Sequence, residues 1–415
     1  MVCFKKIHRR SGCLQPKISI KNVVKVFGKS PQSALELLKQ GSSKKDILKK
    51  TGCTIGVNNA NLDIYEGEIF VVMGLSGSGK STLIRMLNRL IAPTSGEILI
   101  DNENIVNMSP AELRETRRKK ISMVFQNFAL FPHKTILENT EYGLEIQKIP
   151  EQERKQKAME SLEVVGLKGY EDQYPSQLSG GMQQRVGLAR ALASDTDILL
   201  MDEAFSALDP LIRKSMQDEL LEIQDNYKKT IVFITHDLDE ALRIGDRIAL
   251  MRDGRVIQVG TPEEIMMNPA NDYVERFIED IDLSHVLTAS SIMTRAERIT
   301  IDRGPRVALQ IMKDRGYSSI FIVDRKQTLL GALSADQARE AILKKIPIEE
   351  VMTKEVPTAL ENTILSDLLD DMANAQIPLA IVDEANRLKG VLVRGVVIGA
   401  LAGNKDVLQD KEESQ

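Results

Sequence analysis

The sequence predicts an α/β protein in two parts: an N-terminal domain with a largely parallel sheet and a helical subdomain, then a smaller, duplicated α/β module. Three observations support this fold class. Strand-like and helix-like segments alternate along the first part of the chain. A glycine-rich turn near residue 74 joins an apolar strand to a helix. Near the C-terminus, three short sequence matches recur at one offset of 59 residues, which indicates a tandem repeat.

Length and composition are those of a globular protein with more than one domain. The chain has 415 residues, whereas a domain takes about 150. Lys plus Arg number 55 against 59 for Asp plus Glu, a net charge of −4, which argues against a dedicated nucleic-acid partner. No apolar run approaches the roughly 18 residues that span a bilayer. We therefore expect no membrane crossing by this chain.

Hydrophobic patterning places the elements of the N-terminal domain. Strands of a largely parallel sheet are expected at Ile18–Val23, Glu68–Met73, Ile121–Phe125, Asp197–Met201, Thr230–Thr235 and Arg247–Met251. A mostly helical stretch covers about residues 150–194, and a helical insertion at about 32–51 interrupts an early connection between strands. Helices Pro262–Met267 and Tyr273–Asp280 lead toward the repeat.

The repeat pairs Ile292-Met293-Thr294 with Val351-Met352-Thr353, Val323-Asp324 with Val382-Asp383, and Leu330–Leu333 with Lys389–Leu392. Each unit indicates a short strand, an amphipathic helix, a strand ending in Val-Asp, and a further strand. The helices are expected at Val307–Asp314 and Ile364–Ala373.

The patterns together predict the domain boundaries. These are a disordered basic arm at 1–15, the N-terminal domain at 16–275, a linker at 276–286, the repeat units at 287–345 and 346–403, and a polar tail at 404–415. The three cysteines, Cys3, Cys13 and Cys53, form no C-x-x-C pair, as expected for a reduced cytosolic chain.

The glycine-rich turn fits the phosphate-loop pattern G-x-x-x-x-G-K-[ST] between a strand and a helix. It consists of Gly74, Leu75, Ser76, Gly77, Ser78, Gly79, Lys80 and Ser81, and the candidate site extends to Thr82. Glycines let successive N–H groups and the helix N-terminus face phosphate oxygens. Lys80 is then expected to reach the β- and γ-phosphates and Ser81 to ligate Mg²⁺.

A pair of acids completes a candidate nucleotide site. Asp202 and Glu203 follow the apolar run Ile198–Met201, and ligands bind at the carboxyl ends of strands in open α/β sheets. Asp202 suits Mg²⁺, while Glu203 is placed to accept a proton from an attacking water.

The segment Leu178–Arg185 resembles the signature sequence of ATP-binding-cassette (ABC) ATPases. The other markers of that family follow in order, so the resemblance covers roughly residues 18–275. The matching residues are Phe27 for the aromatic that stacks on adenine, Gln126 for the Q-loop glutamine, Ser179, Gly180, Gly181 and Gln183 in the signature, Asp209 in the D-loop Ser206–Asp209, and His236 for the switch histidine.

The resemblance implies a head-to-tail homodimer that encloses two ATP molecules with Mg²⁺. Each ATP would lie between one subunit's phosphate loop and the other's Ser179–Gly181, with Lys80, Glu203 and His236 as the catalytic residues. Gln126 would join Ser81 and Asp202 at the metal. Two alternatives remain at this point: His236 as a packed histidine at a strand end, and Phe27 as a core residue.

One cassette without membrane spans resembles the ATPase subunit of an importer, which would lie at the cytoplasmic face of the membrane on a separate permease. The family docks its permease on the stretch matching Phe128–Tyr142, for which an ordinary loop is the alternative. The insertion and the repeat, which looks like a pair of CBS modules, resemble the ATPase subunits of glycine betaine/proline uptake systems. These systems include an extracytoplasmic solute-binding protein or domain. The alternatives are an importer of another solute, such as choline or methionine, and a regulatory nucleotide sensor.

The CBS resemblance implies regulation by a nucleotide or by ionic strength. The adenosine-binding CBS pattern places an acid three residues after a Ser or Thr, but the first unit has Gln337 after Ser334, and the second has Val393 and Val396. Two alternatives remain for the repeat: it binds a cyclic dinucleotide in a dimer cleft, or it forms a dimer contact without a ligand.

A run of basic residues precedes the strand at Ile121–Phe125. Its members are Arg114, Arg117, Arg118, Lys119 and Lys120. It is either a salt-sensitive contact to anionic lipid headgroups or an ordinary solvated helix face.

Overall fold

The computed structural model describes residues 15–279, 283–375 and 377–401. The chain divides into two compact units, one ending at Glu279 and the other formed mainly by the residues that follow it. The predicted arm except residue 15, the predicted tail, and Cys3 and Cys13 lie outside the described residues. Cys53 is buried as a free thiol.

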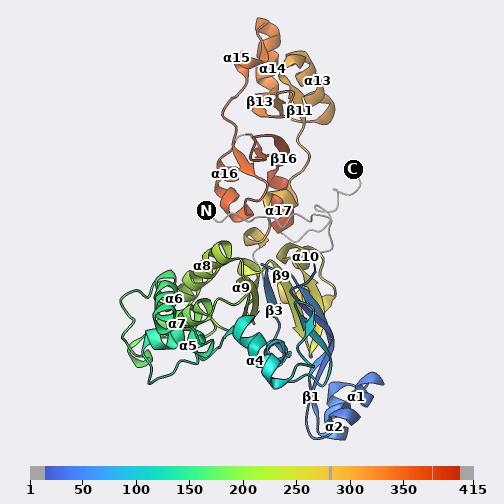
Figure 1. The fold of residues 1–415 in the computed structure, drawn as a ribbon. Helices are drawn as coiled ribbons and strands as arrows, with labels where there is room; N and C mark the ends of the chain where they lie inside the picture. Colours follow the sequence, from blue (N-terminus) through green and yellow to red (C-terminus); the bar gives the residue numbers. More distant parts are fainter. Residues whose placement is uncertain (1–14, 280–282, 376, 402–415) are drawn as a thin grey trace. The chain divides into compact units, whose positions relative to one another are not determined.

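A six-stranded sheet with the order β10-β9-β3-β8-β7-β6 forms the centre of the N-terminal unit (Figure 1). Its strands are β3 Ile69–Met73, β6 Ile121–Val124, β7 Ile198–Asp202, β8 Thr230–Thr235, β9 Arg247–Arg252 and β10 Arg255–Gly260. All neighbours are parallel except β9 and β10, which form a hairpin. Both faces of β3, β7 and β8 are buried, which explains their continuous apolar sequences.

The first expected strand does not join this sheet, so that part of the prediction is wrong. β1 (Ile18–Phe27) lies in a four-stranded antiparallel sheet, β2-β1-β4-β5, with β2 Thr54–Ile64, β4 Ser95–Ile100 and β5 Glu103–Asn104. Ile18 pairs with Ile64 on one side and with Ile100 on the other. The chain between β1 and β2 folds away as an insertion, and a parallel pair would need a crossover packed on the sheet instead.

The insertion consists of two short helices, α1 (Pro31–Lys39) and α2 (Lys44–Thr51). Ser43 caps α2 by accepting from the Asp46 N–H, and Gly52 ends it in the left-handed region. The helices enclose a small core of their own with the nearby ends of β1 and β2, made of Val24, Val26, Ala34, Leu35, Ile47, Cys53 and Ile55.

Three helices form the helical subdomain, drawn in green in Figure 1: α5 (Ile136–Ile146), α6 (Glu151–Val164) and α7 (Gly180–Ala193). This subdomain therefore includes a helix that precedes the stretch expected at residues 150–194. The remaining helices of the N-terminal unit are α3 Lys80–Leu87, α4 Pro110–Lys119, α8 Pro210–Tyr227, α9 Leu238–Ile244, α10 Pro262–Met267 and α11 Asp272–Ile278. No helix in the described ranges is both long enough and apolar enough to cross a membrane.

The C-terminal unit contains two three-stranded sheets of the same design. The first module has β11 Arg298–Thr300, α13 Pro305–Arg315, β12 Ser319–Val323, β13 Leu329–Ser334 and α14 Ala335–Lys344. The second has β14 Thr358–Leu360, α16 Leu369–Asn374, β15 Leu379–Val382, β16 Leu388–Leu392 and α17 Arg394–Leu401. The helix expected at Ile364–Ala373 is divided, because a 3₁₀ turn at Leu365–Leu368 precedes α16.

The segment that precedes each module's sheet pairs with a strand of the other module. Thr294, ahead of the first sheet, exchanges two backbone hydrogen bonds of 2.9 Å with Val391 of the second, and Thr353 does the same with Ala332 of the first. A Cβ on Gly390 would lie 2.8 Å from the Thr294 carbonyl oxygen, and one on Gly331 would lie 2.6 Å from that of Thr353. Each repeated glycine thus lies where the other module's chain crosses, which accounts for two of the three sequence matches.

Candidate active site

The phosphate loop joins the end of β3 to α3 and depends on its glycines. Gly74, Gly77 and Gly79 have φ values of +147°, +78° and +107°, which favour glycine. A Cβ on Gly74 would lie 2.2 Å from the Met251 carbonyl oxygen, and one on Gly79 would lie 2.4 Å from that of Gly56. Only glycine therefore fits at these two positions.

Lys80 extends its ammonium back over the loop that precedes it. Its Nζ donates to the carbonyl oxygens of Gly74 at 2.8 Å and Leu75 at 3.2 Å. The side chain is 4% exposed, and burial lowers its pKa, although the carboxylates of Glu203 and Asp202 oppose the shift. The Ser78 hydroxyl is buried without a hydrogen-bond partner. A buried cation beside an unsatisfied hydroxyl suits an incoming anion.

The two acids lie at the end of β7 in different surroundings. Asp202 is buried, and its Oδ2 is 3.1 Å from an Arg85 nitrogen. Glu203 has a φ of +47°, and its N–H donates to the Ile234 carbonyl oxygen of β8 at 3.2 Å. This strained conformation is held by the neighbouring strand, as is common for residues at active sites.

Three predicted catalytic and binding side chains meet at Glu203. Gln126 Nε2 donates to Glu203 Oε2 at 3.3 Å. His236 Nδ1 is 3.8 Å from the same oxygen, and Lys80 Nζ is 3.9 Å from Oε1. These residues follow β6, β8 and β3, so the carboxyl ends of adjacent parallel strands gather them, as expected for a doubly wound sheet.

Asp209 caps α8 and lies close in sequence to an arginine that connects two loops. Its Oδ1 accepts from the Ile212 N–H at 3.1 Å. Arg213 donates to the Leu208 carbonyl oxygen at 3.2 Å and to Asp237 Oδ2 at 3.1 Å. Arg213 therefore joins the predicted D-loop to the residue that follows His236, a contact that sequence reasoning missed.

The signature segment lies in the helical subdomain, and in the described part of the chain no hydrogen bond or ion pair joins it to the residues that meet at Glu203. Ser179 is the N-cap of α7 and accepts from the Met182 N–H at 3.4 Å. A Cβ on Gly181 would lie 2.8 Å from Ile212 Cγ2. Gln183 donates to the carbonyl oxygens of Pro175 and Leu178, so its amide holds the preceding turn in place. Gly180 opens α7 next to Ser179.

Phe27 ends β1 with 41% of its surface exposed. A Cβ on Gly56 would lie 2.6 Å from the Phe27 ring and 3.3 Å from Thr82 Cγ2. The ring therefore borders the first turn after the phosphate loop and is not a core residue. Gly56 was not singled out in the sequence, because nothing local indicates that its carbonyl oxygen adjoins Gly79.

The predicted metal ligands suit Mg²⁺ chemically. Ser81, Gln126 and Asp202 offer hydroxyl, amide and carboxylate oxygens, the donors that Mg²⁺ prefers together with phosphates and waters. In the described ranges, no cluster of three or more His, Cys, Asp or Glu side chains forms a metal site by itself. A nucleotide's own phosphates would have to complete the coordination.

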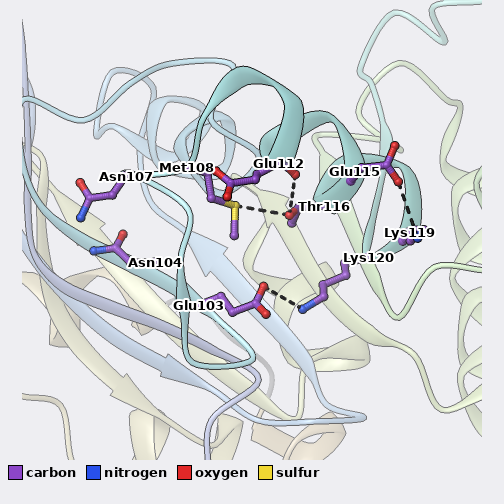
Figure 2. Close-up of a pocket in the computed structure, with 9 residues that line it drawn as sticks. All are labelled: Glu103, Asn104, Asn107, Met108, Glu112, Glu115, Thr116, Lys119 and Lys120. Atoms are coloured by element: carbon purple, nitrogen blue, oxygen red, sulfur yellow. Dashed lines mark hydrogen bonds and ion pairs between the residues drawn. The ribbon is translucent and has the colours of Figure 1, made fainter.

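Three of the five residues in the predicted basic cluster contact carboxylates. Arg118 and Lys119 contact Glu115 at 2.9 and 3.6 Å, Lys120 contacts Asp101 at 3.0 Å, and Arg117 donates to the Asn88 carbonyl oxygen. An open cavity of about 580 Å³ lies beside α4 (Figure 2). Its lining consists of Glu103, Asn104, Asn107, Met108, Glu112, Glu115, Thr116, Lys119 and Lys120. These pairings favour the solvated helix face over the lipid contact.

Two family models match the chain. The model described as ABC transporter matches residues 57–206, and the CBS domain model matches residues 289–344 and 348–403. Among solved structures, the post-hydrolysis dimer of the ATP-binding cassette MJ0796, bound to ADP and Pi, is 35% identical with a TM-score of 0.51. The alignment covers 59% of this chain and 98% of that one. The fold and motifs therefore define an ABC ATPase followed by tandem CBS domains.

Curated relatives match nearly the whole chain. The glycine betaine transport ATP-binding protein OpuAA of Bacillus subtilis is 63% identical over 94% of each chain. The glycine betaine/carnitine transport ATP-binding protein GbuA of Listeria monocytogenes is 57% identical over 94% of this chain and 98% of the relative. The glycine betaine/proline betaine transport system protein ProV of Escherichia coli is 51% identical over 93% and 97%. The chain belongs to the ABC transporter family as an ATP-hydrolysing, ATP-binding subunit, which confirms the resemblance seen in its motifs.

Proposed function

We propose that this protein is the energy-coupling ATPase of an importer for quaternary ammonium compatible solutes of the glycine betaine, proline betaine and carnitine type. The solute class is supported by relatives named for such transport, which are 51–63% identical over more than nine tenths of the chain. The structural observation that supports the ATPase role is that the side chains of Lys80, Gln126 and His236 all lie close to the Glu203 carboxylate.

The roles of the residues follow from their chemistry. Lys80 and the N–H groups of residues 74–82 hold the phosphates, and Phe27 stacks on adenine. Glu203 takes a proton from water as the water oxygen bonds to the γ-phosphorus and the bond to the β-γ bridging oxygen breaks. His236 orients the γ-phosphate and the water, and Gln126 fixes the Glu203 carboxylate. Ser81, Asp202 and Gln126 would hold Mg²⁺, which would supply charge neutralisation on the phosphates.

A second copy of the chain completes the site. Ser179, Gly180 and Gly181 form a helix N-terminus with a hydroxyl and open N–H groups, a suitable cradle for phosphate. Asp209 would lie at the same interface. Related cassettes form dimers, which supports a head-to-tail homodimer with two ATP molecules at its interface.

The remaining partners follow from the transport role. The subunit would bind a transmembrane permease through Phe128–Tyr142 and lie peripherally at the cytoplasmic face of the membrane. A solute-binding protein or domain would deliver the solute outside. No nucleic-acid partner is proposed, given the net charge of −4.

Reconstitution tests the function. The chain is purified with the permease and solute-binding protein of its own transport system and placed in liposomes. We expect ATP-dependent uptake of labelled glycine betaine, and loss of uptake in Glu203→Gln. Uptake of methionine instead of glycine betaine would overturn the proposed solute class, and unchanged uptake in Glu203→Gln would overturn the role of Glu203.

The CBS modules are proposed to regulate the transporter. In the first module, Gln337 accepts from the Ser334 N–H at 2.8 Å and donates to Thr353 Oγ1 at 3.0 Å. This glutamine lies where adenosine-binding modules carry an acid, which disfavours ATP or AMP and leaves a cyclic dinucleotide between two copies as the proposed ligand. Deletion of residues 287–415 should preserve ATPase activity but remove its response to salt or to cyclic dinucleotide. An unchanged response in the reconstituted transporter would exclude this regulation.

A further inference from the structure

The helical insertion brings a lysine to the turn that supports the phosphate loop. The turn between β9 and β10 supports this loop, since the Gly254 N–H donates to the Ser78 carbonyl oxygen at 2.8 Å. Lys44, the first residue of α2, lies on the same turn. A Cβ on Gly254 would be 3.0 Å from Lys44 Nζ and 2.8 Å from the Gly56 carbonyl oxygen.

Gly56 connects this lysine to the adenine side of the site. Its carbonyl oxygen adjoins both Gly254 and Gly79, while its Cα faces the Phe27 ring. The Lys44 ammonium, the phosphate loop and the candidate adenine platform therefore surround one residue of β2. The two helices of the insertion, which the motifs do not explain, thus position a cation beside the turn that supports the phosphate loop.

The charge of Lys44 is not satisfied locally. Within the described part of the chain, no carboxylate lies within 4 Å of its Nζ, and its ammonium has no hydrogen bond. Lysines such as Lys17 and Lys120 contrast with it, because each contacts two carboxylates. Burial lowers the pKa of Lys44, the more distant Asp253 carboxylate raises it, and Arg255 lowers it again. A partly desolvated cation without a partner gains most from an anion that arrives on binding.

We propose that Lys44 binds the phosphate chain of the nucleotide and so makes the insertion part of the nucleotide site. The assignment rests on the proposed role of residues 74–82 in binding ATP. Lys44 would be the second lysine at the phosphates, besides Lys80. It belongs to α2, which lies outside the phosphate loop and beside the turn that contains Gly254.

Nucleotide binding to the full chain tests this assignment. Dissociation constants of ATP, ADP and adenosine are measured by calorimetry in a Glu203→Gln background, which prevents turnover. Lys44→Ala should raise the dissociation constants of ATP and ADP about three- to tenfold, the range expected for one charge-assisted contact that is partly exposed to solvent. Adenosine, which has no phosphate, should bind as before. Lys44→Arg should restore most of the loss, and the salt dependence of ATP binding should become shallower in Lys44→Ala.

Matched variants separate the alternatives. Lys45 is the next residue of α2 and is exposed, so Lys45→Ala should leave all three constants unchanged. Two results would overturn the proposal, because each would show that Lys44 only stabilises the turn. One is an equal loss of affinity for ATP and for adenosine in Lys44→Ala. The other is a loss of ATP affinity in Asp253→Asn as large as that in Lys44→Ala. If Lys80→Ala weakens ATP binding but Lys44→Ala does not, the proposal for Lys44 is wrong while the phosphate-loop site stands. If neither does, the phosphate-loop site fails as well.

Discussion

Glu240 is a buried carboxyl group close to the candidate active site. It lies in α9, four residues after His236, and is 6% exposed. Gln217 Nε2 donates to its Oε1 at 3.2 Å. Burial raises its pKa, the neighbouring Asp237 raises it further, and hydrogen bonds from Thr235 and Gln217 oppose the shift. The charged form is thus disfavoured where α8 packs against α9.

The sign of this shift predicts a pH-dependent stability. Because the folded pKa lies above the unfolded value of about 4.3, the contribution of Glu240 to stability is fully present below the unfolded pKa. It is lost as pH rises through the folded pKa. Glu240→Gln keeps the shape without the charge, so its Tm relative to the wild type should rise by about 2–4 °C between pH 4.5 and pH 8.

Thermal unfolding of both proteins across this pH range measures the difference. Glu222→Gln is the control, because Glu222 lies on α8 and its side chain is exposed. A Tm difference for Glu240→Gln that does not change with pH would contradict the assigned shift.

At the scale of elements, Arg213 connects the N-terminal end of α8 to the loop before α9. It contacts the Leu208 carbonyl oxygen and the Asp237 carboxylate at once. One side chain therefore joins the predicted D-loop to the loop that follows His236, so we expect Arg213 to act as a positioning residue.

Loss of this connection should slow turnover more than it weakens binding. Arg213→Met should lower kcat for ATP about tenfold, which corresponds to about 1.4 kcal/mol of barrier, with little change in KM. Lys214→Met, at the exposed next position, is the control. Steady-state kinetics check the split, and an increase in KM with normal kcat would contradict it.

Sequence reasoning located the elements well where burial is continuous. The runs in β3, β7 and β8 are buried on both faces, so their ends were predicted to within about one residue. β1 was placed in the wrong sheet because its partners β2 and β4 lie far along the chain. Pairing partners depend on tertiary packing and not on local pattern.

The candidate site shows the same division between local and distant information. Lys80, Gln126, Glu203 and His236 carry motifs, and the parallel strands bring them together as expected. Arg213 and Lys44 carry no motif, since each acts through a contact with a distant loop. Gly56 is the clearest example, because only the folded chain shows that its carbonyl oxygen meets Gly79.

At the scale of the whole molecule, the N-terminal unit holds the two proposed halves of the nucleotide site on different subdomains. The phosphate loop and Glu203 belong to the central sheet, while Ser179, Gly180 and Gly181 open a helix of the helical subdomain. A single copy offers no shared contact between these halves among the described hydrogen bonds and ion pairs. Two copies arranged head to tail would bring each phosphate loop to the other's signature.

A structure of Glu203→Gln with ATP and Mg²⁺ tests this account most directly. The variant should bind ATP without hydrolysing it and collect as a dimer. We predict two ATP molecules at the interface, each touching Lys80 of one copy and Ser179 of the other. ATP enclosed within a single copy, with Ser179 exposed to solvent, would contradict the account.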